Sequence, residues 1–250
     1  MRSIAIMQIS GGSGATTLAM NLAHLSVWPN AKRIMLSLNP ADAGDIFFRF
    51  GFPEQNSIYV DPSELYAEHS VISLGYDVGA PDRRMPSKLA LTTPDNWVLP
   101  IVPQPSFTAP LDPRQPPWWE LLLSKSADAD VDTIIDAGRI LPDYYGIHRR
   151  IFDYADTVYL LIASEWELQK AKVVASRHSA KTVLVLVGEA ASLEEKVDPF
   201  GFSETLLMPH DKRLAAEFAK ATVATEAKER AVRGYLQLLA EISTAGQADG

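Results

Sequence analysis

Two kinds of apolar pattern alternate along the chain. Short apolar runs rich in β-branched residues are separated by longer stretches in which apolar residues recur every three or four positions. Most short runs are continuous rather than alternating, which is typical of strands buried on both faces of a parallel sheet. The predicted strands are residues 4–9, 33–38, 97–102, 133–136, 157–162, 182–187 and 204–208. The predicted helices are residues 16–27, 118–126, 146–154, 165–178, 212–219 and 225–242.

This alternation predicts an α/β fold with a doubly wound, mostly parallel sheet of seven or eight strands and helices on both faces. A chain of 250 residues suits one large domain. We therefore expect a single domain over residues 1–242, followed by a flexible C-terminal tail over residues 243–250.

Two stretches interrupt the pattern. Residues 53–96 are rich in turn formers, and residues 103–117 are rich in proline, which prevents regular structure. Trp118 and Trp119 follow the proline-rich stretch directly. One interpretation is a loop that crosses the sheet edge and places both tryptophans in the core. The other is an exposed docking surface, because aromatic anchors dominate protein interfaces.

Composition narrows the classes of partner. The formal charge of −8 disfavours non-specific attraction to DNA or anionic lipid, so we expect no direct nucleic-acid binding. The chain contains no cysteine, which excludes disulfides and thiolate metal sites. The apolar run at residues 1–7 is too short for a signal peptide or a membrane span. These features predict a cytoplasmic protein.

The most informative segment is a glycine-rich loop between a predicted strand and a predicted helix. Residues 9–17 read Ile-Ser-Gly-Gly-Ser-Gly-Ala-Thr-Thr. Glycines allow the backbone to turn tightly and aim amide N–H groups inward, and the following helix N-terminus adds attraction for anions. The candidate phosphate-binding residues are Gly11, Gly12, Ser13, Gly14, Ala15, Thr16 and Thr17. The Thr16 hydroxyl stands where a P-loop places its Mg²⁺ ligand.

With the Leu-Ala-Met-Asn-Leu-Ala run at residues 18–23, this loop resembles the opening of the MinD/ParA family of deviant Walker P-loop NTPases, in which it reads Lys-Gly-Gly-x-Gly-Lys-Thr-Thr. The resemblance extends over nearly the whole chain. Asp136 ends a segment similar to the family's Walker B strand, and Ala155-Asp156 is similar to its Ala-Asp before the next strand. Asp211, in Pro-His-Asp, resembles a residue near the base pocket. The resemblance implies the MinD-like P-loop (SIMIBI) fold, ATP and Mg²⁺ as ligands, and a homodimer.

The chain departs from this pattern at its charged positions. Ser10 and Ala15 replace both family lysines, and Ser37 and Asn39 stand where the family carries acidic residues. One lost lysine–phosphate contact removes roughly 1.5–3 kcal/mol of binding, so weakened nucleotide binding remains compatible with the sequence. Loss of cations that stabilise the transition state can cost on the order of 10³–10⁵ in rate. We therefore expect a pseudo-ATPase with no catalytic residues.

Three charged residues have two interpretations each. Asp136 either caps the amides of the loop or, with Thr16, holds Mg²⁺. Arg139 is either a surface charge or a substitute phosphate contact. Asp211 either contacts the base or is the N-cap of the following helix, which explains it without a ligand.

The Ala-Thr-Thr-Leu-Ala run at residues 15–19 resembles one branch of the family, the TadZ/CpaE proteins that localise pilus machinery. This similarity implies a non-hydrolysing scaffold for pilus or secretion assembly, recruited through protein partners to the pole or the inner face of the membrane. A second hypothesis is a slow ATPase of the partitioning or division-site class that uses Lys170, Lys172 or Arg139 instead. A third is a protein-binding module without nucleotide.

Overall fold

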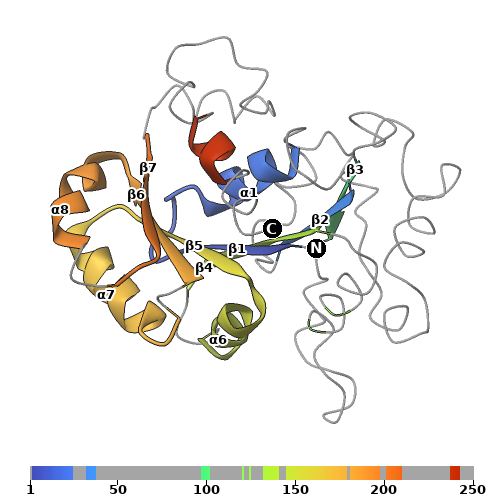
Figure 1. Ribbon diagram of the computed structural model, residues 1–250, viewed down its shortest axis with the longest axis horizontal. Coiled ribbons are helices and arrows are strands. Elements are labelled where there is room, and N and C mark those ends of the chain that lie inside the picture. The colour runs from blue at the N-terminus through green and yellow to red at the C-terminus, as the bar shows by residue number, and fades with distance from the viewer. Residues whose placement is uncertain are drawn as a thin grey trace, which may run out of the picture.

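The protein is built on a seven-stranded parallel sheet. A computed structural model describes residues 2–24, 32–37, 97–101, 120, 124, 132–140, 145–178, 181–197, 201–209 and 237–242. Within these ranges the strand order is β3-β2-β4-β1-β5-β6-β7, and every neighbouring pair is parallel. Figure 1 shows the sheet running through the centre of the molecule with helices above and below it. The predicted parallel α/β architecture is therefore confirmed.

All seven predicted strands are present, with small shifts at their ends. The strands are β1 (Ser3–Gln8), β2 (Lys32–Ser37), β3 (Trp97–Ile101), β4 (Asp132–Arg139), β5 (Thr157–Ile162), β6 (Thr182–Val187) and β7 (Glu204–Met208). The largest difference is in β4, which runs past the predicted end at residue 136 because Gly138 and Arg139 still pair with β1. The side chains of β1 and β6 are buried throughout, as continuous apolar runs require.

The helices cover both faces of the sheet because the chain winds outward from its centre in two directions. Helix α1 (Ala15–His24) joins β1 to β2, whereas α6 (Tyr145–Tyr154) and α7 (Glu165–Ala175) join β4 to β5 and β5 to β6. Crossovers of one hand in opposite directions place their helices on opposite faces. In Figure 1, α1 and the helical residues 237–242 lie on one face, and α6 and α7 lie on the other.

The boundaries of α7 follow from its caps. Ser164 is the N-cap, and its hydroxyl oxygen accepts a hydrogen bond from the Glu167 amide (3.3 Å). The helix ends at Ala175 rather than at the predicted residue 178, because the Ser176 and His178 amides donate to carbonyls three residues back. Beyond β6, the chain forms a 3₁₀ helix (Gly188–Leu193) that leads into the short helix α8 (Glu194–Val197).

The amino edge of the sheet, where the parallel strands begin, is held by two carboxylates. Asp132 Oδ1 accepts a hydrogen bond from the Arg2 amide (2.6 Å). Asp156 Oδ2 accepts from both the amide (2.7 Å) and the hydroxyl (2.8 Å) of Ser3. These bonds tie the start of β1 to the starts of β4 and β5, so the Ala155-Asp156 pair has a structural role at this edge.

Several predictions fall outside the described residues. They concern the predicted helix over residues 212–219, residues 225–236 of the last predicted helix, and the predicted helix over residues 118–126 except for residues 120 and 124, which are helical. They also concern the stretches over residues 53–96 and 103–117 with Trp118 and Trp119, and the tail over residues 243–250. None of the described helices is long and apolar enough to cross a membrane.

Candidate functional site

The glycine-rich loop begins where β1 ends, at the centre of the carboxyl edge of the sheet. The Ile9 amide donates to Leu161 O of β5 (3.3 Å), and the Ile140 amide donates to Gln8 O (2.9 Å), so the start of the loop is held between the ends of β4 and β5. The winding direction of the chain reverses here, since β1 leads to β2 on one side whereas β4 leads to β5 on the other. In doubly wound sheets, ligands bind outside the carboxyl ends of the strands at this switch point.

The loop conformation depends on two glycines. Gly12 and Gly14 adopt φ angles of 88° and 94°, in the left-handed region that side chains with a Cβ atom disfavour. A Cβ atom at Gly14 would also lie 3.1 Å from Met208 Cε at the end of β7. Gly11 and Gly12 are exposed. The backbone conformation therefore favours glycine at position 14, and a Cβ atom there would also require the end of the Met208 side chain to move by a few tenths of an ångström.

Several hydrogen bonds define the loop and the start of α1. The Leu18 amide makes the first helical bond, to Gly14 O (2.9 Å). Upstream of it, the Ala15 amide donates to Gln8 Oε1 (3.4 Å), and Ser13 Oγ donates to Ser10 O (3.3 Å). Amides in the first turn of a helix have no intrahelical acceptor and carry the positive end of the helix dipole. This arrangement is suited to binding an anion.

The two positions where the resembled family carries lysines hold small, uncharged side chains. Ser10 is partly buried. Ala15 is only 1% exposed and belongs to the hydrophobic core cluster together with Leu18 and Met208. Neither side chain supplies a positive charge to the loop.

Asp136 lies at the same edge of the sheet. Its side chain is completely buried, and Oδ1 accepts a hydrogen bond from the Gly138 amide (3.1 Å). Gly138 has a φ angle of 60°, and the register between β1 and β4 slips beside it, between Ile6 and Met7. In the sheet register, Asp136 is aligned with Ile6 of β1 and Ser37 of β2. Thr16, in the first turn of α1, is partly buried at this same edge.

A buried histidine contacts the end of β4 from α6, on the face of the sheet opposite α1. His148 of α6 is 4% exposed, and its Nε2 lies 3.1 Å from Ala137 O. Because a carbonyl oxygen only accepts hydrogen bonds, Nε2 is the donor. His148 was not identified from the sequence. Its spacing from Asp136 does not indicate a contact with β4, because that contact depends on how α6 packs against the sheet.

The structure separates the candidate substitute cations. Arg139 is exposed and aligned with Gln8, so it lies at the edge that carries the loop. Lys170 lies on the exposed side of α7, where its Nζ is 3.9 Å from the centroid of the Trp166 ring. Lys172 is exposed as well. The structure therefore brings Arg139, and neither lysine, to the edge with the loop. Asn39 and Asp211 lie outside the described residues.

No protein-family model matches the sequence, and neither does any curated protein. Solved structures are similar over almost the whole chain. MinD from Aquifex aeolicus, in a complex with MinC, has a TM-score of 0.59 and 14% identity and aligns over 100% of this chain and 97% of its own. A protein of Borrelia burgdorferi described as a plasmid partition protein, bound to AMPPNP, has a TM-score of 0.62 and 14% identity over 98% and 99% of the two chains.

MinD from Pyrococcus horikoshii, complexed with Mg-ADP, has a TM-score of 0.58 and 16% identity over 98% of this chain and 97% of its own. Identities this low establish the architecture and leave the activity open. The chain has the P-loop NTPase fold of MinD and the plasmid partition proteins.

Proposed function

We propose that this protein is a MinD/ParA-like scaffold that binds ATP and Mg²⁺ weakly at the glycine-rich loop and hydrolyses ATP little or not at all. The observation that carries the proposal is the contrast within the loop. Gly12 and Gly14 keep the left-handed backbone of a phosphate cradle, whereas Ser10 and Ala15 remove both expected cations.

The residues that would hold the nucleotide are those of the loop and its neighbours. Backbone amides of residues 11–17 would bind phosphate oxygens, and Thr16 with Asp136 would hold Mg²⁺ directly or through water. Asp211 would contact the base. Two structures with the same fold contain AMPPNP and Mg-ADP, which supports a nucleotide as the ligand class.

Weak binding and slow turnover follow from the same substitutions. The missing lysine at position 15 removes a charge-assisted hydrogen bond worth roughly 1.5–3 kcal/mol, which corresponds to about one or two decades of affinity. Phosphoryl transfer depends almost entirely on positioned charge, so the two missing cations reduce the rate far more than the affinity. Backbone amides alone bind a triphosphate without stabilising its transition state.

The proposed role is that of the TadZ/CpaE branch, a cytoplasmic localisation factor for pilus or secretion machinery. We infer a homodimer and protein partners that recruit the complex to the pole or the inner membrane face. Two observations support this inference: the Gly-Ala-Thr-Thr sequence of the loop and the MinC:MinD assembly found among proteins of the same fold.

Isothermal titration with ATP and Mg²⁺, combined with a steady-state phosphate-release assay, tests the proposal. We expect saturable heat at a dissociation constant below about 100 µM, a free energy of roughly −5 kcal/mol or stronger, without measurable turnover. Turnover at ordinary rates for this class of ATPase, abolished by Asp136→Ala, would contradict the scaffold. Absence of heat at millimolar ATP would contradict nucleotide binding.

Restoring the lysines provides a sharper test. The double variant Ser10→Lys/Ala15→Lys is expected to tighten ATP binding by about one to two decades, because each new ammonium group can contact phosphate oxygens. Ser10→Met/Ala15→Met is the matched control, since it adds similar length without charge. Equal affinities of the two double variants would show that lysines at positions 10 and 15 do not contact the phosphates, and would contradict the cause assigned to weak binding.

One observation favours a second candidate, a slow ATPase of the partitioning class. Arg139 is exposed at the end of β4 and aligned with Gln8, whose side chain already contacts the loop. If the protein is a slow ATPase, the guanidinium group of Arg139 takes the place of one of the lysines of the MinD/ParA family. Arg139→Gln would then abolish phosphate release, whereas Arg150→Gln, a change on α6 away from the loop, would leave it intact.

The hydrogen bond from the Ala15 amide to Gln8 Oε1 favours the third candidate, a protein-binding module without nucleotide. In that case the side chain of Gln8 satisfies an amide that the cradle would otherwise offer to phosphate. Titration separates this candidate from the other two, because it alone predicts no heat with ATP.

A further inference from the structure

A hollow separates α6 and α7 on the face of the sheet opposite α1. Its volume is about 380 Å³. The residues of α6 that line it are His148, Arg149 and Phe152, and the C-terminal part of α7 with the turn after it contributes Val173, Val174, Ser176, Arg177 and His178. The hollow is distinct from the glycine-rich loop and goes beyond the function proposed for that loop.

The hollow lies toward the amino edge of the sheet, away from the loop. Helices α6 and α7 both start near the carboxyl edge and end near the amino edge, because each connects two parallel strands. The lining residues of α7 belong to its last turn and the turn that follows. A molecule seated there would leave the carboxyl edge accessible to nucleotide or to a second copy of the chain.

The floor and one rim of the hollow are apolar. Phe152 is almost fully buried and stacks on the His178 ring, with a centroid distance of 5.4 Å and an interplanar angle of 18°. Val173 is 70% exposed, an unusual exposure for a valine on a packed helix. Val173, beside the stacked rings of Phe152 and His178, therefore offers a surface against which an apolar side chain can pack.

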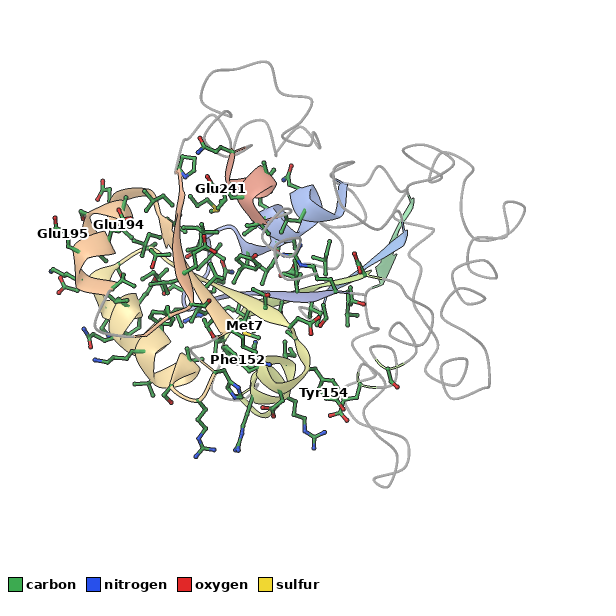
Figure 2. All side chains as sticks on the ribbon, viewed as in Figure 1. Met7, Phe152, Tyr154, Glu194, Glu195 and Glu241 are labelled. Atoms are coloured by element: carbon green, nitrogen blue, oxygen red, sulfur yellow. The ribbon has the colours of Figure 1, made fainter. Side chains whose placement is uncertain are left out.

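The other lining groups are cationic. Arg149 and Arg177 are exposed at the hollow, and none of the described residues that line it is an aspartate or a glutamate. The chain as a whole has a formal charge of −8, so this cationic hollow contrasts with the rest of the molecule. Figure 2 shows Glu194, Glu195 and Glu241 on α8 and the C-terminal helical segment, away from Phe152 of the lining.

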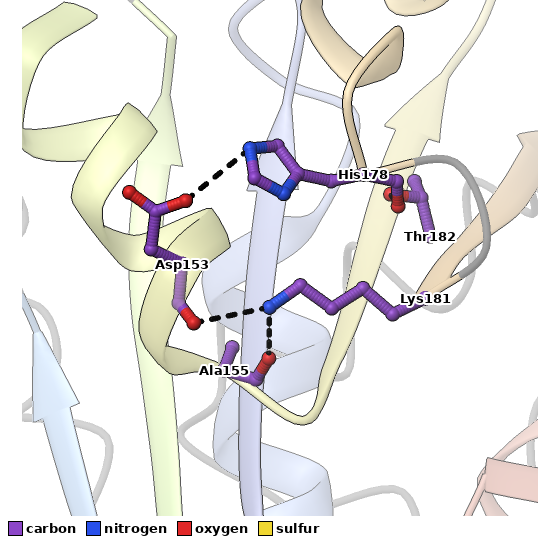
Figure 3. A network of polar contacts seen from close by, with 5 residues as sticks. All are labelled: Asp153, Ala155, His178, Lys181 and Thr182. Carbon is purple, nitrogen blue, oxygen red and sulfur yellow. Dashed lines mark hydrogen bonds and ion pairs between the residues drawn. The ribbon is translucent and has the colours of Figure 1, made fainter.

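The wall beside His178 is held in place by a polar network. Asp153 Oδ1 lies 3.4 Å from His178 Nε2, and Lys181 Nζ donates to Asp153 O (3.2 Å) and Ala155 O (2.8 Å), as Figure 3 shows. The Asp153 carboxylate, which belongs to the residue after Phe152, is therefore directed at His178, and the Lys181 ammonium group lies close to the backbone of Asp153. Burial lowers the pKa of Lys181, whereas Asp153 and Asp156 oppose that shift. The network fixes the end of α6 against the turn that follows α7, so the hollow is preformed.

We propose that the hollow between α6 and α7 is the docking site for an acidic segment of a partner protein, with an apolar side chain on Val173 beside the Phe152–His178 stack and flanking carboxylates on Arg149 and Arg177. The argument is charge complementarity combined with an apolar floor. Arginine binds carboxylates in bidentate geometry, and interface anchors are apolar side chains with charged groups at the rim.

Other occupants fit the hollow less well. An anionic membrane or DNA presents negative charge over an area much larger than the hollow, so most of that charge would face a molecule with a net charge of −8, whereas a short acidic segment brings its carboxylates only to Arg149 and Arg177. A free phosphate would contact the arginines but would make no contact with the apolar part of the hollow. An acidic peptide with a hydrophobic residue would contact both the arginines and the apolar part of the hollow.

The test measures fluorescence anisotropy with the full-length protein and a labelled peptide in which leucine is flanked by glutamates. We expect saturable binding that weakens roughly tenfold in Arg149→Glu/Arg177→Glu, because two rim charges are reversed. The matched control is Arg150→Glu/Lys196→Glu, which makes the same change in net charge at residues that do not line the hollow. A lysine-flanked peptide is expected to bind the first double variant better than the native protein.

The apolar contact between the peptide and the hollow is tested by separate variants in the same anisotropy assay. Val173→Ser, a change at an exposed position, and a peptide with serine in place of leucine should each weaken binding several-fold. Equal binding by the two charge-reversed variants, or no binding at millimolar peptide, would overturn the proposal. Vesicles containing anionic lipid and inorganic phosphate are tested in the same way. If either bound in a manner that depends on Arg149 and Arg177 while the peptide did not bind, that result would also overturn the proposal.

Discussion

The two edges of the parallel sheet carry different chemistry. At the amino edge, Asp132 and Asp156 accept hydrogen bonds from Arg2 and Ser3 and tie three strands together. At the carboxyl edge, a glycine-rich loop is held by backbone hydrogen bonds and by the side chains of Gln8 and Ser13. One edge uses carboxylates to hold the fold, whereas the loop at the other edge, residues 9–17, contains no charged residue. The fold of the sheet therefore does not depend on charged side chains in the loop.

The largest effect is expected at the amino edge. Asp132 is 4% exposed, and Asp132→Ala leaves the Arg2 amide without this acceptor. We expect a loss of about 3 kcal/mol in the free energy of unfolding, measured by urea denaturation. Asp132→Asn, which keeps an acceptor oxygen, should lose clearly less. If both variants were as stable as the native protein, the amino edge would not have the structural role assigned to it.

Alkaline pH tests the neighbouring core. Burial raises the pKa of Tyr159 from 10.0 to about 12, with Arg2 acting in the opposite direction. Because the unfolded chain ionises first, the folded protein binds more protons between these pH values, and stability is lost as pH rises from 10 to 12. A shift of this size corresponds to roughly 2–3 kcal/mol.

Thermal unfolding as a function of pH measures this loss. Tyr159→Phe removes the ionisable group and should flatten the stability profile between pH 10 and 12. An unchanged slope in that variant would assign the alkaline transition to another group.

Substitution at the carboxyl edge should cost less. Gly14→Ala places a Cβ atom at a φ angle of 94° and 3.1 Å from Met208 Cε, so we expect a loss of about 1–2 kcal/mol. Gly11→Ala is the matched control, because no atom lies within 4 Å of its Cβ position. Equal stabilities of the two variants, measured by denaturant titration, would show that the loop does not need the left-handed conformation at position 14.

The smallest effect concerns the competition between Gln8 and phosphate. Gln8→Met removes the acceptor of the Ala15 amide at similar volume, so nucleotide no longer has to displace it. We expect ATP affinity to rise by about two- to tenfold, since a net hydrogen bond is worth about 1 kcal/mol. Gln8→Glu keeps an acceptor and adds negative charge, so it should weaken binding. Titration calorimetry with both variants distinguishes this competition from a purely structural role of Gln8.

The sequence predicted the sheet well because its strands are buried on both faces. Continuous apolar runs such as those of β5 and β6 give the same signal in any parallel sheet, and all seven strands were identified. The predicted strand ends were less accurate where tertiary contacts determine them. At β4, for example, the last residues pair with β1 beyond the predicted end. The candidate phosphate loop was also found from sequence, because glycine spacing between a strand and a helix is a local feature.

The sequence by itself determined the order of strands and helices, the position of the loop and the absence of lysine at positions 10 and 15. Only the tertiary structure decided which distant residues meet. It aligns Arg139 with Gln8, directs His148 to Ala137 O and leaves a cationic hollow between α6 and α7. The reason is physical: periodicity records how each segment faces the core, whereas contacts between segments depend on the crossover geometry that packs helices onto the sheet.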